Sequence, residues 1–385
     1  MSQNQKKFGI VLAIILLSYF MILLDNSIIF TSLVRIASDL HLDAQTLAWV
    51  SSAYTLTFGG FQLFGGRLGD VYGRKRVFLI GLLLFSFGSL MVGLSTNSWR
   101  YGFFLNVPVG LLMFILTIRY VADNQNKSAT RLDIVGTILS VLGLSALVYS
   151  IDGTSHQLLA LVAAVIALGL FVYAEHVIKT PIMPLRLFAD RQRNSAYIAR
   201  FFFIGGAFAY YFVTTQALQH IYGFTPLLTG LAFLPVTIPQ FVGALQVSRL
   251  SSKLGTARLI VLADLLVTLS FLATVVLGID RGYWIAIVIP MIIFGYGQGL
   301  VLSPLTMEGV ANTDPEIAGA ASGVVNTVHQ FGQSVGVSVV IALTSSVHDF
   351  SASYHAQLLI IATIAGLSLM AALVLLADRN RQGTR

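Results

Sequence analysis

The chain has 385 residues, of which 56% are hydrophobic and only 10% carry a formal charge. Soluble domains have roughly 25% charged residues, so this composition excludes an ordinary water-soluble fold. The net charge of +7 does not indicate nucleic-acid binding, because the basic residues lie in short loops between apolar segments, where positive charge sets membrane orientation. The absence of cysteine excludes disulfides and thiolate metal sites.

Membrane-length apolar segments follow one another along the chain. A bilayer core admits only helices or closed barrels, and these segments lack the alternation of barrel strands. The first segment is longer than the roughly 7–15 apolar residues of a secretory signal, so we expect it to be a retained span. The sequence predicts an all-α integral membrane protein, with about twelve transmembrane helices in two pseudo-symmetric bundles. The expected spans are 10–31, 45–66, 77–95, 101–121, 133–151, 157–178, 196–218, 226–248, 259–279, 283–306, 318–346 and 355–377.

The distribution of basic residues predicts the orientation. With the N-terminus inside, 20 of the 23 Lys and Arg residues lie on the cytoplasmic side, and only Arg35, Arg100 and Arg281 lie outside. We therefore expect a multi-pass protein of the plasma membrane with both termini in the cytoplasm. The expected domains are an apparently truncated N-terminal bundle (1–121), two additional or replacement spans with a cytoplasmic linker (122–195), and a C-terminal six-helix bundle (196–385).

A glycine-rich basic loop occurs twice, with an offset of 182 positions. Such a repeat is typical of transporters built from two related halves. We expect the loops to form a conformational latch, whose charge and helix-end contacts hold one conformation and break in another; the alternative is that the charges only set topology. The latch residues are Gly66, Arg67, Asp70, Gly73, Arg74 and Arg76 in the first copy and Arg249, Gly255 and Arg258 in the second, where Ser252 replaces the acid.

The first loop resembles the motif between the second and third spans of the major facilitator superfamily. Other motifs resemble those of its fourteen-span drug:proton antiporters, and they occur in the order of that branch. The resemblance implies a facilitator-type fold and proton-coupled drug export. The matching segments are Leu24–Ile28, Gly66–Arg76, Trp99–Gly110, Pro181–Phe188, Gly223–Gly230 and Ala318–Gly323.

One departure from that branch leaves two interpretations open. The motif beginning at Trp99 and Arg100 opens the sixth span in the branch, whereas here it follows the third expected span. The fourth and fifth spans are then missing, together with the membrane-embedded arginine and the Gly-Pro motif of antiporters. Alternatively, the chain is an ordinary six-plus-six transporter, since the two loop copies lie six expected spans apart.

Asp25, inside the first expected span, is the candidate proton-coupling residue. An ionised acid at that depth costs about 2.5–3.5 kcal/mol, so it should face a cavity or hold a proton. The alternative is a neutral acid hydrogen-bonded to a neighbouring helix. Asp264 lies near the cytoplasmic edge and close to Arg258, which favours pairing, and we expect Glu175 and Glu308 to be solvated at span ends.

Aromatic and amide side chains within the spans are candidates for a substrate cavity that takes bulky amphipathic cations. Helix packing is the alternative role for each of them. The segment 318–346 also carries a polar stripe and the pairs Gly319/Gly323 and Gly332/Gly336, which predict close packing. The candidates are Asn26, Tyr54, Phe58, Gln62, Tyr210, Gln216 and Gln240, together with Asn326, His329 and Gln330, which continue to Gln333 at spacings of three, four and seven residues.

These patterns predict a non-enzymatic transporter that exports drug-like or amphipathic compounds in exchange for protons by alternating access. The chain has no GxxxxGK[ST] loop and no metal-ligand spacing, so we expect neither ATP nor a cofactor or metal. Protons, a small-molecule substrate and the lipid bilayer are the expected partners. The alternative is a non-transporting remnant of such a transporter, and the oligomeric state stays open.

Overall fold

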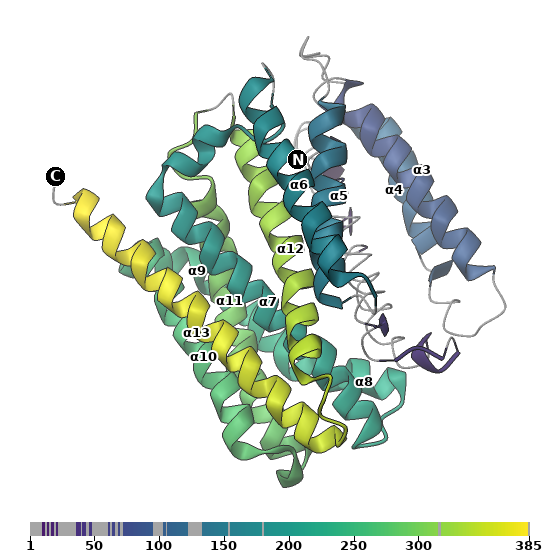
Figure 1. The fold of residues 1–385 in the computed structure, drawn as a ribbon, viewed down its shortest axis with the longest axis vertical. Coiled ribbons are helices and arrows are strands. Elements are labelled where there is room, and N and C mark those ends of the chain that lie inside the picture. The colour runs from purple at the N-terminus through teal and green to yellow at the C-terminus, as the bar shows by residue number, and fades with distance from the viewer. Residues whose placement is uncertain are drawn as a thin grey trace. The chain divides into compact units, whose positions relative to one another are not determined.

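The computed structural model is helical throughout the part of the chain that it describes (Figure 1). It describes residues 10–11, 14, 17–18, 21, 36–39, 41–43, 46–47, 61, 64–65, 68–69, 72–94, 103–104, 106–121, 133–152, 155–178, 181–314 and 317–383. Eight of the candidate site and latch residues lie outside this part: Asp25, Asn26, Tyr54, Phe58, Gln62, Gly66, Arg67 and Asp70.

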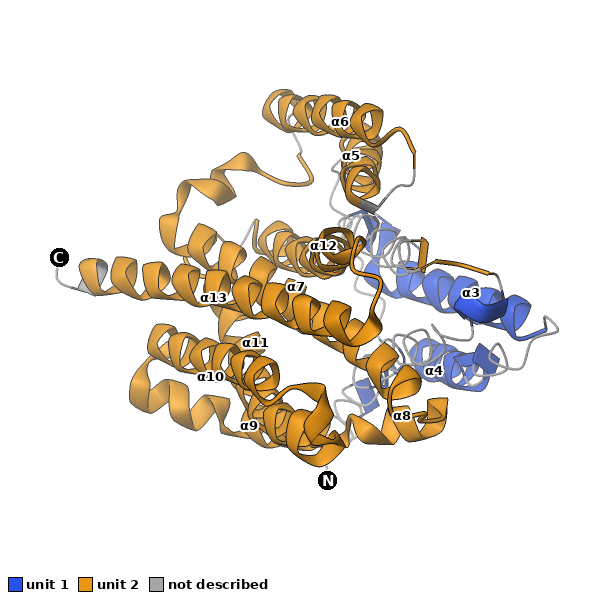
Figure 2. Cartoon of the chain, turned by 60° about the horizontal axis from the view of Figure 1, so that its bottom comes forward, with its two compact units in different colours: residues 1–39, 64–132 blue, residues 40–63, 133–385 orange. Residues whose placement is uncertain are grey.

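The chain forms two compact units, which Figure 2 shows in two colours. Unit 1 comprises residues 1–39 and 64–132, and unit 2 comprises residues 40–63 and 133–385. The three-domain division expected from the sequence stays a prediction.

Unit 1 contains α3 (Arg74–Gly93) and α4 (Asn106–Tyr120), which pack against each other. Leu82 of α3 and Met113 of α4 belong to the buried apolar core of this unit. Near the start of α3, Lys75 donates from Nζ to the carbonyl oxygens of Ile118 (3.0 Å) and Val121 (2.6 Å) at the end of α4. A lysine at these carbonyls stabilises α4, because the C-terminal end of a helix carries partial negative charge.

In the second segment of unit 2, which starts at residue 133, the first two helices are α5 (Ile134–Asp152) and α6 (Gln157–Val177). They pack against each other as a hairpin, and α5 also packs against α12. Large apolar side chains of α6 are exposed, as expected of a helix that faces lipid rather than water. The remaining helices form a bundle in which α7 packs on α12 and α13, and α11 packs on α9 and α10. They are α7 (Arg191–His220), α8 (Pro226–Ala232), α9 (Leu234–Leu254), α10 (Thr256–Leu277), α11 (Ile289–Gly309), α12 (Ala318–Thr344) and α13 (Phe350–Gly383), with short turns at η2 (Leu185–Ala189), η3 (Ile279–Arg281) and η4 (Trp284–Val288).

Within the described residues, eight helical segments are long and apolar enough to cross a membrane. The helix α12 is not among these eight, because its polar stripe makes it less apolar. Its 27 residues nevertheless extend about 40 Å, which is longer than the hydrocarbon core of roughly 30 Å. From 77–95 onward, every expected span contains a helix, so the prediction of an all-α membrane protein is confirmed.

Proline explains the two irregular spans. The expected span 226–248 is divided between α8 and α9 at Phe233, two residues before Pro235. The next irregularity is the π-helical turn η4, which ends just before Pro290. Proline has no N–H to donate to the preceding turn, so the backbone adjusts there. Pro239 and Pro304, by contrast, lie inside α9 and α11.

The two copies of the basic loop share a backbone conformation. Gly73 precedes α3 with φ 95° and ψ 127°, and Gly255 precedes α10 with φ 84° and ψ 149°. Residues with a side chain rarely adopt this positive φ. The internal repeat read from the sequence therefore extends to the local structure of both loops.

Candidate functional site

A buried arginine joins three helices of unit 2. Arg200 of α7 is only 6% exposed, and its Nη1 donates to Thr306 Oγ1 of α11 at 2.8 Å and to the Leu302 carbonyl at 3.4 Å. Its Nη2 lies 3.2 Å from Nδ1 of His329 on α12. We call Arg200, Thr306 and His329 the Arg200 cluster. Charged residues in membrane spans usually face a bundle interior or a water-filled path and mark a functional site.

The Arg200–His329 contact determines the state of the imidazole ring. A guanidinium group can only donate hydrogen bonds, so Nδ1 of His329 must accept. The ring is therefore neutral and carries its proton on Nε2. The ring of Phe208 also packs edge-on against His329, with centroids 6.0 Å apart. His329 thus contacts both a guanidinium group and an aromatic ring.

A second polar contact lies farther along the same two helices. Tyr211 of α7 donates its hydroxyl to Gln298 of α11 at 2.8 Å, and its ring packs against Phe233 and Phe294. Tyr211 and Arg200 are eleven positions apart, which places them on the same face of α7 because eleven residues complete about three helical turns. Polar groups therefore follow one face of α7.

Glycines bring α7 and α12 into backbone contact beside the cluster. A Cβ atom added to Gly332 would lie 2.5 Å from the Phe201 carbonyl oxygen, and one added to Gly336 would overlap the backbone of Gly205. The predicted packing through Gly332 and Gly336 is confirmed. The packing predicted for the other pair is wrong at Gly319, where nothing lies within 4 Å.

The polar stripe of α12 divides into residues with different surroundings. His329 joins the Arg200 cluster, whereas Gln333 is 3% exposed and has a buried amide nitrogen with no hydrogen-bond partner in the described part of the chain. Asn326 and Gln330 are half-buried, and neither forms a hydrogen bond with another described residue. Their role in lining a cavity stays a prediction.

The three candidates from later spans lie in separate places. Tyr210 is fully buried, and its ring packs against Phe271 and Phe294 at centroid distances of 5.0 and 5.4 Å. Gln216 lies six residues farther along α7, and Gln240 lies on α9; both are half-buried. Tyr210 thus contributes to the packing of α7, α10 and α11, and the structure does not bring these three side chains together.

We expected Asp264 to pair with Arg258 because both lie near the membrane edge, but the structure does not show this pair. The Oδ2 of Asp264 lies 2.8 Å from the hydroxyl of Ser368 on α13, and that hydroxyl is also 2.9 Å from the carbonyl oxygen of Ala199. Serine has one hydroxyl proton and the carbonyl can only accept. If both contacts are hydrogen bonds, Asp264 must be the protonated donor in one of them. Arg258 is instead exposed, because its side chain lies on another face of α10.

Two acids at span ends are buried, although we expected them to be solvated. Glu308 of α11 is 2% exposed, accepts a hydrogen bond from the Gln192 amide and forms an ion pair with Arg379 of α13. Glu175 of α6 is 3% exposed and accepts from the Met183 N–H at 2.8 Å. The expectation failed because groups outside each helix, the nearby Met183 for Glu175 and the distant Gln192 and Arg379 for Glu308, take the place of water.

Among the described residues of the two basic loops, one contact involves a residue that the sequence did not single out. The arginines are exposed at helix ends, while the capping contact in unit 1 comes from Lys75 between two of them. In the second copy, the Ser252 hydroxyl donates to the carbonyl oxygen of Arg249 at 2.8 Å. The latch itself stays a prediction. The described members are Gly73, Arg74, Arg76, Arg249, Gly255 and Arg258.

Sequence reasoning missed Arg200 because it counted this residue among the cytoplasmic charges, although Arg200 lies inside the expected span 196–218. The apolar stretch from Ser195 to Ile204 on both sides of it is the signal that could have found it, since a lone arginine there is inside a helix. In the described part of the chain, no three His, Asp or Glu side chains come together as metal ligands would.

Comparisons with known proteins agree on one family. The model of the Major Facilitator Superfamily matches residues 15–337. The cephamycin export protein CmcT of Amycolatopsis lactamdurans is 27% identical, and the match covers 86% of this chain and 83% of that protein. The puromycin resistance protein pur8 of Streptomyces alboniger is 27% identical over 85% of this chain and 80% of its own length. The multidrug resistance protein Stp of Mycobacterium tuberculosis is 28% identical over 84% of this chain and 73% of its own length.

The comparison with the CmcT protein also reveals unmatched length. It runs over 405 positions, whereas 86% of 385 residues is about 331 residues. About 74 positions of the comparison therefore have no residue in this chain.

Solved structures give the same fold. A structure of proton-dependent oligopeptide transporters matches with a TM-score of 0.58 over 99% of this chain and all of its own, at 15% identity. The nucleoside transporter NupG matches with a TM-score of 0.53 over 96% and 98%, at 16% identity. At such identities the likeness concerns the fold alone.

Proposed function

We propose, because the chain belongs to the major facilitator superfamily, that it exports drug-like or amphipathic compounds in exchange for protons by alternating access. The family makes it a membrane transporter, and the names of its relatives refer to export and resistance. The substrate class and the proton coupling are the parts that we add. The proposed location is the cell membrane, with both termini in the cytoplasm.

The observation that carries this proposal is the Arg200 cluster. A guanidinium group inside a membrane bundle is retained against a cost of several kcal/mol, which is typical of substrate and ion pathways. Here it is held by Thr306 and His329 from two other helices, and the Phe208 ring packs against His329. Fixed polar groups next to aromatic walls are the usual lining of a site for amphipathic compounds.

Asp25 is the proposed proton-coupling residue. It is an acid in the first span, and desolvation there favours its protonated form. A carboxyl group that binds a proton in one conformation and releases it in another couples transport to the proton gradient. We further propose that its half of the transporter lacks the fourth and fifth spans of the fourteen-span branch.

The unmatched length supports that deletion. Two spans of roughly 20 residues with their loops account for most of the about 74 positions of the CmcT comparison that this chain lacks. Removing two spans leaves every later helix in its original orientation. The ordinary six-plus-six interpretation would instead spread the unmatched positions over many loops.

Efflux from everted membrane vesicles tests the proposal. Vesicles carrying the chain should expel a fluorescent cationic dye when energised, and a protonophore should abolish the transport. Asp25→Asn should abolish coupled transport, since an amide cannot carry the proton. Arg200→Gln should lower the initial rate by about tenfold or more, the effect of losing a charge-assisted contact. Lys253→Gln, at an exposed residue of α9, is the matched control.

Two outcomes contradict the proposal. Transport that persists with the protonophore would exclude proton coupling. Activity that appears only when two family-type spans are inserted after Asn97 would identify the chain as a non-transporting remnant.

A further inference from the structure

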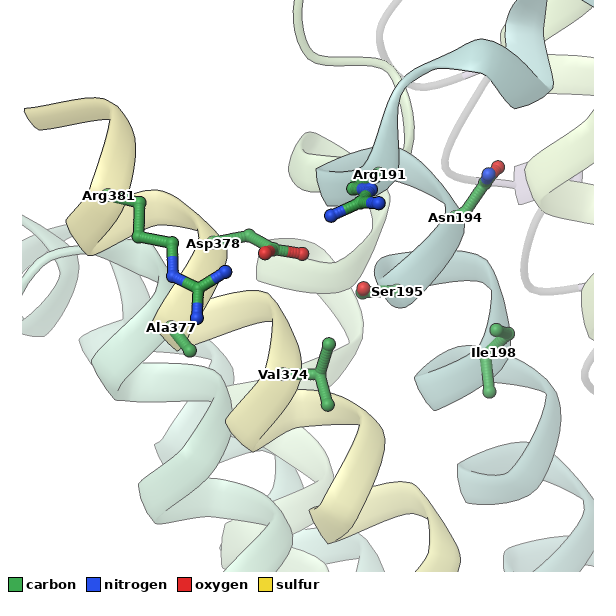
Figure 3. Close-up of a pocket in the computed structure, with 8 residues that line it drawn as sticks. All are labelled: Arg191, Asn194, Ser195, Ile198, Val374, Ala377, Asp378 and Arg381. Atoms are coloured by element: carbon green, nitrogen blue, oxygen red, sulfur yellow. The ribbon is translucent and has the colours of Figure 1, made fainter. Parts of the chain in front are cut away.

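A cavity of about 470 Å³ lies in unit 2 between the beginning of α7 and the end of α13 (Figure 3). Three charged side chains line it: Arg191 on α7, and Asp378 and Arg381 on α13. Together they give the cavity a net formal charge of +1. We call this space the α7–α13 pocket.

A serine hydroxyl that lines the pocket has no hydrogen-bond partner among the described residues. Ser195 is 7% exposed, and its hydroxyl forms no hydrogen bond with any described residue. Figure 3 shows this oxygen directed into the pocket. Beside it, the Asn194 amide donates to the Phe188 carbonyl at 2.6 Å, while its own oxygen is buried and unpaired in the described part of the chain. The Ser195 hydroxyl is therefore available to donate a hydrogen bond to a ligand in the pocket.

The walls of the pocket are apolar and face outward. Ile198 of α7 and Val374 of α13 line it and are 50% and 53% exposed. Both lie within helices that are long and apolar enough to span the membrane, so their exposed surfaces contact lipid. The pocket therefore has a basic, hydrogen-bonding end at the helix termini and an apolar end against the bilayer.

We propose that the α7–α13 pocket binds the phosphate headgroup of a glycerophospholipid. Arg191 and Arg381 supply the planar donors that suit phosphate oxygens, and Ser195 supplies a further donor. The acyl chains lie along Ile198 and Val374. This site is separate from the Arg200 cluster and does not depend on the proposed transport activity.

The alternative source of the same chemistry is free phosphate. The apolar walls favour the lipid, because inorganic phosphate gains nothing from Ile198 and Val374. Under the proposed orientation the pocket lies at the cytoplasmic leaflet, where basic pockets between spans recognise anionic headgroups.

Native mass spectrometry of the full chain, purified in detergent, tests the assignment. Phosphatidylglycerol is titrated into the protein, and the bound fraction is compared between variants. Arg191→Gln/Arg381→Gln should lower the affinity about tenfold, as expected for lost charge-assisted hydrogen bonds. Arg186→Gln/Lys253→Gln removes the same charge from exposed positions near the ends of other helices, and should bind like wild type.

Competition distinguishes the two sources of phosphate. Inorganic phosphate and glycerol 3-phosphate, each equimolar with the lipid, should leave phosphatidylglycerol bound. Ser195→Ala is a milder variant that removes only the unpaired hydroxyl, so it should fold normally and bind the lipid more weakly. Equal lipid binding by both double variants, unchanged binding by Ser195→Ala, or displacement by inorganic phosphate would overturn the proposal.

Discussion

The contact between α7 and α12 yields the sharpest prediction for mutagenesis. A methyl group at Gly336, as in Gly336→Ala, would lie 2.5 Å from the carbonyl carbon of Gly205 and closer still to its Cα and carbonyl oxygen. Carbon atoms pack at about 3.5–4.0 Å, so the two helices must separate by about 1 Å. The three atoms nearest to the new methyl group are all backbone atoms, which a change of rotamer cannot move aside.

The separation should lower both stability and transport. Overpacking of this kind typically costs about 1–3 kcal/mol, against up to about 1 kcal/mol gained from the higher helix propensity of alanine. Arg200 lies five residues before Gly205 on α7, and His329 lies seven residues before Gly336 on α12. A shift of about 1 Å would stretch their 3.2 Å contact beyond hydrogen-bond length.

The measurements are the thermal unfolding of purified protein and dye efflux in vesicles. Gly366→Ala on α13 is the control, because nothing lies within 4 Å of a Cβ atom at that position. We expect a lower melting temperature and slower efflux for Gly336→Ala, and neither effect for Gly366→Ala. Equal melting temperatures and rates for the two variants would refute the helix-contact argument.

Three further substitutions test individual contacts. Asp264→Asn should change the free energy of unfolding by less than about 1 kcal/mol, since its amide can donate to Ser368 as a protonated carboxyl does; a larger loss in chemical unfolding would mean that Asp264 is ionised. Glu308→Ala leaves buried donors unpaired and should cost about 1–3 kcal/mol, reduced because the Arg379 side chain is 47% exposed, and unfolding unchanged from wild type would contradict this. Lys75→Met should lower the free energy of unfolding by about 0.5–1.5 kcal/mol, because it removes the contacts at the end of α4. Amide hydrogen exchange at the end of α4 should then become faster, and slower exchange there would contradict the prediction.

The helices from α3 onward were predictable because length and apolarity are properties of the chain itself. The break in the helix at Phe233 could also have been predicted from the sequence, because Pro235 cannot donate a hydrogen bond to the preceding turn. The same holds for Gly332 and Gly336, whose four-residue spacing places two gaps on one helix face. In each case a local pattern determines the outcome.

Contacts between distant segments were not predictable in this way. Hydropathy gives the depth of Glu308 in the membrane, but not its neighbours Gln192 and Arg379, which are 116 and 71 positions away. Arg200 was counted with the cytoplasmic basic residues before it, although it is the tenth residue of α7. A single sequence contains the polar groups but not their pairing.

The protonated state inferred for Asp264 bears on which acid couples transport. A coupling acid must gain and lose its proton during each cycle. Asp264 is 1% exposed, and no described side chain forms an ion pair with it; Ser368 is its side-chain partner. Its deprotonation would leave one hydroxyl proton for two acceptors, the carboxylate and the Ala199 carbonyl, and would bury an unpaired charge. The packing of α7, α10 and α13 therefore opposes cycling at Asp264, which favours the proposal that Asp25 is the coupling acid. Proton-driven efflux that survives Asp25→Asn but is lost in Asp264→Asn would reverse this assignment.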